Sequence, residues 1–205
     1  MAEPHVNSRL EAFCDGVFAI ALTLLIIDIK IPPSAHIEST GDFWRELRHV
    51  LPSIYAFLLS FAIILITWVN HHDALRGVDK SSHPFVFANG FMLLTVVLVP
   101  FPTALLGEHL FTDHAAPAVV LYTGVCLLQA IAWNVFTRTA LTPRPLTRND
   151  QATLAMRAAH RYSYYAMAVY LVCMTAAFWL PRTVAVVISL IWIVWLIVGI
   201  KNKVD

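Results

Sequence analysis

Residues 51–69 read LPSIYAFLLSFAIILITWV, a run without a single charged side chain. A helix needs roughly 20 apolar residues to cross the hydrocarbon core of a bilayer, so this run has the length of one membrane span. Uncharged runs of similar length recur at residues 85–107, 115–137, 162–181 and 183–200. The sequence therefore predicts five membrane-spanning helices in these segments.

The composition of the whole chain fits a membrane protein. Of its 205 residues, 59% are hydrophobic and 13% are charged, whereas soluble domains average about 45–50% apolar and about 25% charged residues. Spans of this length leave only short connections, which excludes a large extramembrane enzyme domain. A formal net charge of +1 argues against nucleic acid as a partner.

A sixth span is predicted at residues 10–29, and it differs from the other five. Glu11, Asp15 and Asp28 lie within it, so only residues 16–27 are free of charge. An unpaired acid at the depth of Asp15 costs on the order of 2.5–3.5 kcal/mol. We therefore expect Asp15 to find a partner in the WVNHH run at residues 68–72. The expected fold is all-α, with six transmembrane helices in a single domain over residues 1–205.

The basic residues indicate the orientation of these spans. Of the 14 Lys and Arg residues, only Lys30, Arg45, Arg48 and Arg182 fall on the side away from the chain termini. Because basic residues concentrate on the cytoplasmic side, both termini are expected there. The chain is thus expected to be a multi-pass protein of the cell (inner or plasma) membrane.

Three local signals concern the connections and the shape of the helices. A short interfacial helix is expected to begin at Asp42 and to run into the second span, with a kink at Pro52. Pro100 and Pro102 are expected to bend the third span, and Asn149 or Asp150 to cap the helix that enters the fifth.

One face of the first span is apolar. Gly16, Ile20, Thr23, Leu24 and Ile27 recur at helical spacing. Asp15 lies about 140° from Ile20 around the helix axis, so the acid and the apolar face point in different directions. Most aliphatic stripes of this kind only pack against a neighbouring helix, and periodicity alone does not assign this one a function.

The start of this span resembles a known family. Arg9-Leu10-Glu11-Ala12-Phe13-Cys14-Asp15-Gly16, followed by Thr23, resembles the R-x-x-x-F-S-D-G signature of the prokaryotic transmembrane protein 175 family, relatives of the lysosomal potassium channel. The resemblance is strongest here and at residues 68–72. It implies a homotetramer whose first helices line a central pore, with rings of branched aliphatic side chains selecting among monovalent cations. Ile20 would form the narrowest ring, Thr23 and Leu24 the next, and Ile27 a ring further out.

The same resemblance implies a buried signature network. Its members would be Arg9, Phe13, Cys14 and Asp15, with Trp68, Asn70 and His71 as their partners. Cys14 replaces the serine of the signature, and a thiol is a weaker hydrogen-bond donor than a hydroxyl. Asp28 is expected near the outer mouth, either concentrating cations or as a simple exposed acid at the end of a helix.

The sequence thus predicts a potassium-permeable, potassium-selective cation channel with a hydrophobic constriction on its first helix. The alternative is a secondary transporter or proton-coupled carrier that uses Asp15 and His71 as a proton relay, and a third possibility is a structural membrane scaffold. The chain carries no nucleophile elbow, zinc-protease motif or phosphate loop. We therefore expect no enzyme, no catalytic residue and no cofactor apart from permeant K⁺. Cys14, Cys126 and Cys173 stand at neither metal nor disulfide spacings, so no metal site is expected.

Overall fold

The structure is a computed structural model that describes residues 7–30 and 37–201. The helices within these ranges are α1 (Ser8–Leu24), a 3₁₀ helix η1 (Leu25–Asp28), α2 (Thr40–Arg76), α3 (His83–Leu98), α4 (Pro100–His109), α5 (Ala115–Leu141), α6 (Asp150–Ala176) and α7 (Pro181–Lys201). Within these ranges, extended pairing is limited to one isolated bridge between Val78 and Thr147. The expected all-α class is therefore confirmed for the described part of the chain.

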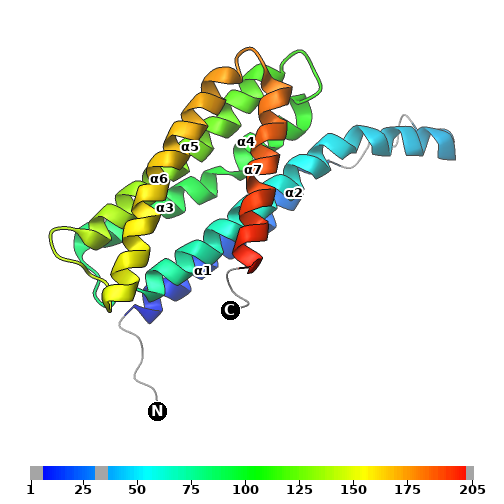
Figure 1. Cartoon of the computed structure of the whole chain (residues 1–205). Coiled ribbons are helices and arrows are strands. Elements are labelled where there is room, and N and C mark those ends of the chain that lie inside the picture. The colour runs from blue at the N-terminus through cyan, green and yellow to red at the C-terminus, as the bar shows by residue number, and fades with distance from the viewer. Residues whose placement is uncertain (1–6, 31–36, 202–205) are drawn as a thin grey trace.

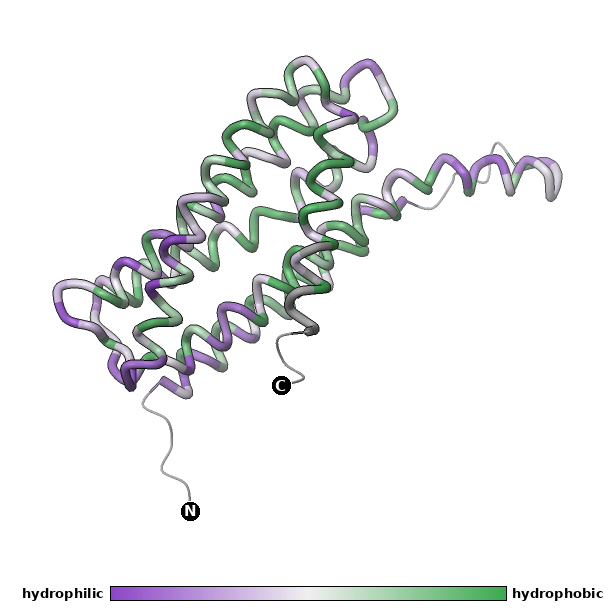
Figure 2. The backbone as a smooth tube through the Cα atoms, viewed as in Figure 1, coloured by the Kyte–Doolittle hydropathy of each residue, from purple (hydrophilic) through white to green (hydrophobic). Residues whose placement is uncertain are grey.

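The helices form an elongated bundle (Figure 1). α5 and α6 pack side by side, α3 packs on α5, and α1 packs on α2 and α3. The N-terminal part of α2 projects away from the bundle (Figure 1). Hydrophobic residues dominate the middle of the bundle, whereas hydrophilic residues gather at its ends and on the projecting part of α2 (Figure 2). This distribution is the one expected of a chain whose middle lies in hydrocarbon and whose ends meet water.

Four helical segments are long and apolar enough to cross a membrane, namely Ser8–Asp28, Thr40–Arg76, His83–His109 and Ala115–Leu141. Taking α1 with η1 and α3 with α4, the described residues form six helical segments, in agreement with the expected number. α6 does not meet the same criterion, and the apolar part found in α7, Pro181–Ile193, is shorter. α6 differs because its first half carries Asp150, Arg157 and Arg161 and tyrosines follow near its middle.

Side-chain caps begin two of the long helices. The Ser39 hydroxyl accepts a hydrogen bond from the Asp42 backbone N–H and donates one to Asp42 Oδ2, at 2.7 Å. This second bond is the main reason why the pKa of the Asp42 carboxyl lies below its ordinary value. Asn149 Oδ1 caps α6 by accepting from the Ala152 N–H at 2.8 Å. The segment expected to be helical from Asp42 is helical, although the helix starts at Thr40 and continues through Pro52 as one helix. Its interfacial position stays a prediction.

The third helical segment is interrupted where Pro100 and Pro102 occur. α3 ends at Leu98 and α4 begins at Pro100, because proline lacks the N–H that continues the helical hydrogen bonds. Next to this break, the Ser60 hydroxyl lies 2.6 Å from Thr103 Oγ1 and 2.9 Å from Tyr122 Oη. These buried hydroxyls join α2, α4 and α5, so the break is held by side-chain hydrogen bonds.

Two hydrophobic clusters form the core. One joins α2, α4, α5, α6 and α7, and includes Leu59, Leu106, Tyr170 and Ile188. The other anchors α1 against α2, α3 and α5, and includes Phe18, Leu25, Phe85 and Phe136. The second cluster fixes the rotation of α1, and that rotation decides which of its side chains remain free.

Candidate functional site

One face of α1 and η1 is completely buried in the bundle. Cys14, Phe18, Ala21 and Leu25 are each at most 1% exposed. Their spacing of four, three and four residues places them along one side of a helix. Because this side faces α2 and α3, α1 is held in a single orientation.

The opposite face of α1 and η1 is open. Ile20 is 60% exposed and Ile27 is 70% exposed, and Gly16, Thr23 and Leu24 are exposed as well. The Thr23 hydroxyl donates a hydrogen bond to the Ile20 carbonyl at 2.9 Å, which satisfies its proton locally. All five residues of the predicted apolar face therefore lie on a surface that this chain leaves uncovered.

The end of this helix differs from the continuous helix expected up to residue 29. The α-helical turns stop at Leu24, and Leu25–Asp28 form a 3₁₀ helix. A 3₁₀ helix advances about 120° per residue where an α-helix advances about 100°. Over three residues this difference turns Ile27 about 60° further around the axis than a continuous α-helix would. Ile27 still lies within about 40° of Ile20.

Arg9 and Phe13 lie outside the buried part of the signature network within one chain. Both are exposed in the single chain, Phe13 by 62%, so their burial in an assembly stays a prediction. The physical reason for their exposure is helical periodicity, since residues 9, 13, 16 and 20 follow one another at spacings of four, three and four. Phe13 therefore continues the exposed face toward the start of α1, and the same periodicity could have revealed this from the sequence.

Three buried polar groups connect α1, α2 and α3. His71 Nε2–H donates to Asn89 Oδ1 at 2.7 Å, and Asn89 Nδ2–H donates to Cys14 Sγ at 3.2 Å. All three residues are at most 1% exposed. The ring of His71 also contacts Phe18 and Phe136, with ring centroids 5.4 Å apart in both pairs. Asn89 is the central member of this network, and the sequence pattern did not identify it.

Asp15 has a different set of neighbours. Trp68 Nε1–H donates to Asp15 Oδ1 at 2.8 Å, and His72 Nδ1 lies 3.8 Å from the same oxygen. Trp68 is thus one of the partners expected for this acid. His71 bonds to Asn89 instead, and Asn70 is exposed without a hydrogen bond among the described residues. Within one chain Asn70 therefore lies outside the network, because it lies on another side of α2 than His71.

The outer end of this region carries separate charges. Asp28 is partly exposed at the end of η1, and Lys30 Nζ lies 3.5 Å from Glu108 Oε2. Both side chains of this ion pair are more than half exposed, so it contributes little to stability. No group of three or more His, Cys, Asp or Glu side chains that could hold a metal ion occurs within residues 7–30 and 37–201.

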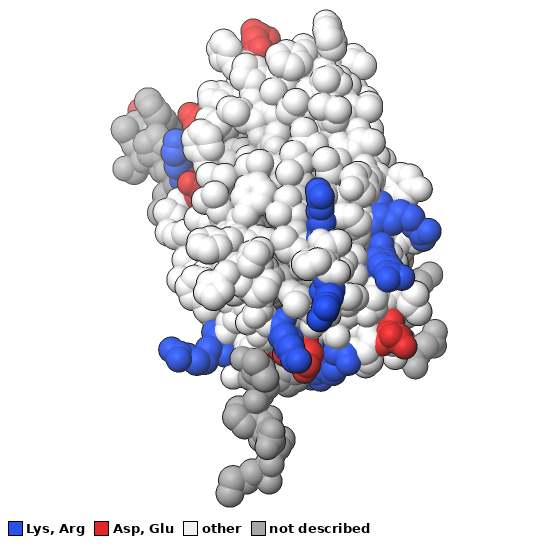
Figure 3. Space-filling model, turned by 90° about the vertical axis from the view of Figure 1, so that its left-hand side faces the viewer, with Lys and Arg blue, Asp and Glu red and all other residues white. Residues whose placement is uncertain are grey.

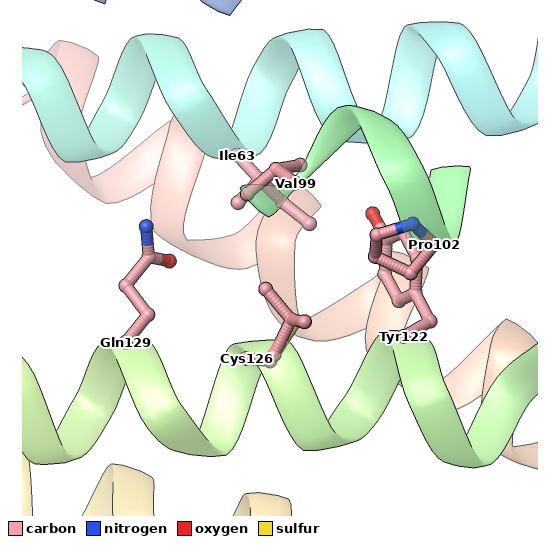
Figure 4. Close-up of a pocket in the computed structure, with 7 residues that line it drawn as sticks. Ile63, Val99, Pro102, Tyr122, Cys126 and Gln129 are labelled. Atoms are coloured by element: carbon pink, nitrogen blue, oxygen red, sulfur yellow. The ribbon is translucent and has the colours of Figure 1, made fainter. Parts of the chain in front are cut away.

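A small enclosed cavity lies deeper in the bundle (Figure 4). It is lined by Ile63 of α2, by Val99 and Pro102 at the break between α3 and α4, and by Tyr122, Cys126 and Gln129 of α5, among others. Its volume of about 10 Å³ is at the lower limit for one water molecule. A small organic substrate does not fit there.

Comparison with known proteins identifies relatives of this chain. Residues 9–100 match the family described as "Endosomal/lysosomal potassium channel TMEM175". The chain is 38% identical over 191 residues to "Potassium channel Cha6605_3372" of Chamaesiphon minutus, covering 92% of this chain and 94% of that protein. The human "Endosomal/lysosomal proton channel TMEM175" is 33% identical over 103 residues, which cover 48% of this chain and 20% of that protein.

A solved structure agrees with the sequence comparison. The crystal structure of a lysosomal potassium-selective channel TMEM175 homologue from Chamaesiphon minutus matches with a TM-score of 0.80 at 37% identity. The match covers 92% of this chain and 96% of the other. The chain belongs to the TMEM175 family of membrane channels.

Proposed function

We propose that the chain forms a potassium-permeable, potassium-selective channel in which four copies surround a pore lined by the open face of α1 and η1. The observation that carries this proposal is the contrast on one helix between the buried side of Phe18 and the exposed side of Ile20. A pore-lining helix needs both, because one side must anchor it and the other must remain uncovered. The potassium-channel name of the Chamaesiphon minutus relative supports the choice of ion.

In the proposed pore, Ile20 forms the narrowest ring. A ring of branched aliphatic side chains offers an ion no replacement for its water, so an ion passes only if it keeps part of its shell or sheds it cheaply. Potassium loses water more easily than sodium, so such a ring favours potassium. Thr23, Leu24 and Ile27 continue the same wall outward, and Asp28 would concentrate cations at the mouth.

The proposal includes a topology. All six helical segments cross the cell membrane, with both termini on the cytoplasmic side as the basic residues indicate. The arginines of α6 then lie at the cytoplasmic boundary, and the Lys30–Glu108 pair lies at the outer one. Lipid on the outside and identical copies toward the axis are the expected partners of the chain.

Potassium flux from liposomes tests this function. Purified wild-type protein should release potassium in preference to sodium. Ile20→Asn should raise the flux severalfold and reduce the preference, because four amides hydrate the constriction. Leu190→Asn, at an α7 residue with a similar exposed fraction, should leave both unchanged. The absence of wild-type flux, or flux that Ile20→Asn does not change, would contradict the proposal.

Asp15 distinguishes the channel from the proton-coupled carrier. The predicted relay pairs Asp15 with His71, but His71 bonds to Asn89 instead. The observation that favours the carrier is the half-exposed carboxyl of Asp15 beside His72. Asp15→Asn keeps an oxygen that can accept the Trp68 bond but removes the titrating group. The channel predicts that potassium flux stays within about twofold and never requires a proton gradient. A carrier would lose coupled transport in this variant, and a structural scaffold would show no flux in either protein.

A further inference from the structure

α6 presents a continuous exposed stripe that the core does not use. Arg157, Arg161, Tyr164, Ala168 and Val172 are all exposed. Their spacing of four, three, four and four residues places them along one side of the helix. The stripe therefore passes from two cations through an aromatic ring to small and aliphatic side chains.

The two cations of this stripe are not neutralised by the chain itself. Among the described residues, neither Arg157 nor Arg161 forms an ion pair. The guanidinium of Arg161 lies 5.8 Å from the ring centroid of Tyr162, a contact that leaves its charge in place. Lys and Arg side chains gather in the lower half of the face in Figure 3, with few acidic side chains among them. This is the end of the bundle at which α6 begins (Figure 1).

The depth of the stripe matches one leaflet of a bilayer. The fifth span predicted from the sequence begins at residue 162, so Arg161 lies at the inner boundary of the hydrocarbon. Arg157 lies one turn outside this boundary, in the headgroup region, and the long side chain of Arg161 can extend to the same level. Tyr164 then lies where aromatic residues meet headgroups, and Ala168 and Val172 lie at the depth of acyl chains.

In the proposed assembly, the exposed stripe of α6 faces lipid. α6 packs mainly on α5, whereas α1 packs on α2 and α3. If α1 surrounds the axis, α6 lies at the periphery of the assembly, and this step rests on the proposed function. We propose that the stripe is a binding site for an anionic phospholipid of the cytoplasmic leaflet. Arg157 and Arg161 hold its phosphate-bearing headgroup, and its acyl chain lies along Ala168 and Val172.

Native mass spectrometry of the intact assembly tests this site with phosphatidylglycerol and phosphatidylcholine as probes. The wild type should retain phosphatidylglycerol preferentially. One arginine near an anionic surface is worth about fivefold in binding, so Arg157→Gln with Arg161→Gln should reduce the preference on the order of tenfold or more. Arg157→Lys with Arg161→Lys should keep most of it. Lys80→Gln with Arg144→Gln, which removes two exposed charges outside α6, should leave it unchanged.

Three results would overturn the lipid site. The first is equal retention of the two lipids by the wild type, and the second is an equal loss in the Lys80 and Arg144 control, which indicates diffuse charge. The third is a changed oligomeric state in the α6 variant, which indicates contact between copies. Potassium flux measured in parallel separates this proposal from the channel function. Flux without lipid preference rejects only the site, whereas lipid preference without flux rejects the channel.

Discussion

The two faces of α1 carry the same kinds of apolar side chain, but one face is buried and the other is exposed. Phe18 and Leu25 are buried against the bundle, whereas Ile20 and Ile27 remain uncovered on the other side of the same turns. The buried face is part of the hydrophobic core, so substitutions there should destabilise the fold. The second face is free of that constraint, so changes there should alter permeation and leave the fold intact. Substitutions on each face can therefore break or sharpen the contrast.

The largest effect on stability is expected at Phe18. Phe18→Ala leaves a cavity between α1, His71 and the neighbouring core, and should lower the free energy of unfolding by about 3 to 5 kcal/mol. Phe13→Ala, at an exposed residue of the same type, should cost less than about 1 kcal/mol in the protomer. Thermal unfolding in detergent measures both. Equal losses would show that the two faces are not distinct.

Two glycines give the next comparison. A Cβ atom at Gly107 would lie 2.8 Å from the Ser53 Cα, so Gly107→Ala must push α4 away from α2 and should cost about 1 to 3 kcal/mol. A Cβ atom at Gly16 meets no atom within 4 Å, so Gly16→Ala should leave the stability unchanged or raise it by up to about 1 kcal/mol. A loss at Gly16 as large as that at Gly107 would contradict the open face of α1.

A smaller effect is expected at Asn89. Asn89→Leu removes both hydrogen bonds that link Cys14 and His71, and should cost about 1 to 2 kcal/mol because the buried imidazole N–H loses its acceptor. Asn134→Leu, which removes one bond to Ser163 between α5 and α6, should cost about half as much. If Asn89→Leu proves neutral in the melting temperature, the network does not hold α1.

The smallest effect is expected at Cys14. Cys14→Ser restores the signature serine, and its hydroxyl can accept the same hydrogen bond from Asn89 Nδ2. The melting temperature should therefore change by an amount equivalent to less than about 1 kcal/mol. A large loss would show that the site requires the volume of sulfur, in which case packing outweighs hydrogen bonding there.

The sequence predicted the open face of α1 because helical periodicity is local. Gly16, Ile20 and Ile27 could be assigned to one side without knowledge of any other helix. The same rule should have assigned Phe13 to this side, but the signature motif suggested a buried network instead. The role of Asn89 could not be predicted, because it depends on three helices meeting at one point, and a single sequence does not show non-local contacts.

Other differences came from competing local effects. The change to a 3₁₀ helix after Leu24 is not marked by a proline or glycine, so no residue type there indicates the end of the α-helix. α6 was expected to begin its span at residue 162, but the helix itself extends back to Asp150, where Asn149 caps it. The cap was predictable from residue type, whereas the exposure of Arg157 and Arg161 on one side of α6 depends on the assembled bundle.

Water access to Ile27 tests the central claim most directly. The three native cysteines are buried, so a membrane-impermeant charged thiol reagent should react with Ile27→Cys and leave the wild type unmodified. If Ile27 lines the pore, the reagent added from the outer side blocks potassium flux through Ile27→Cys, whereas Leu190→Cys on α7 continues to conduct. Unmodified thiols and unchanged flux in Ile27→Cys would place this face against lipid or protein, and the proposed pore would be wrong.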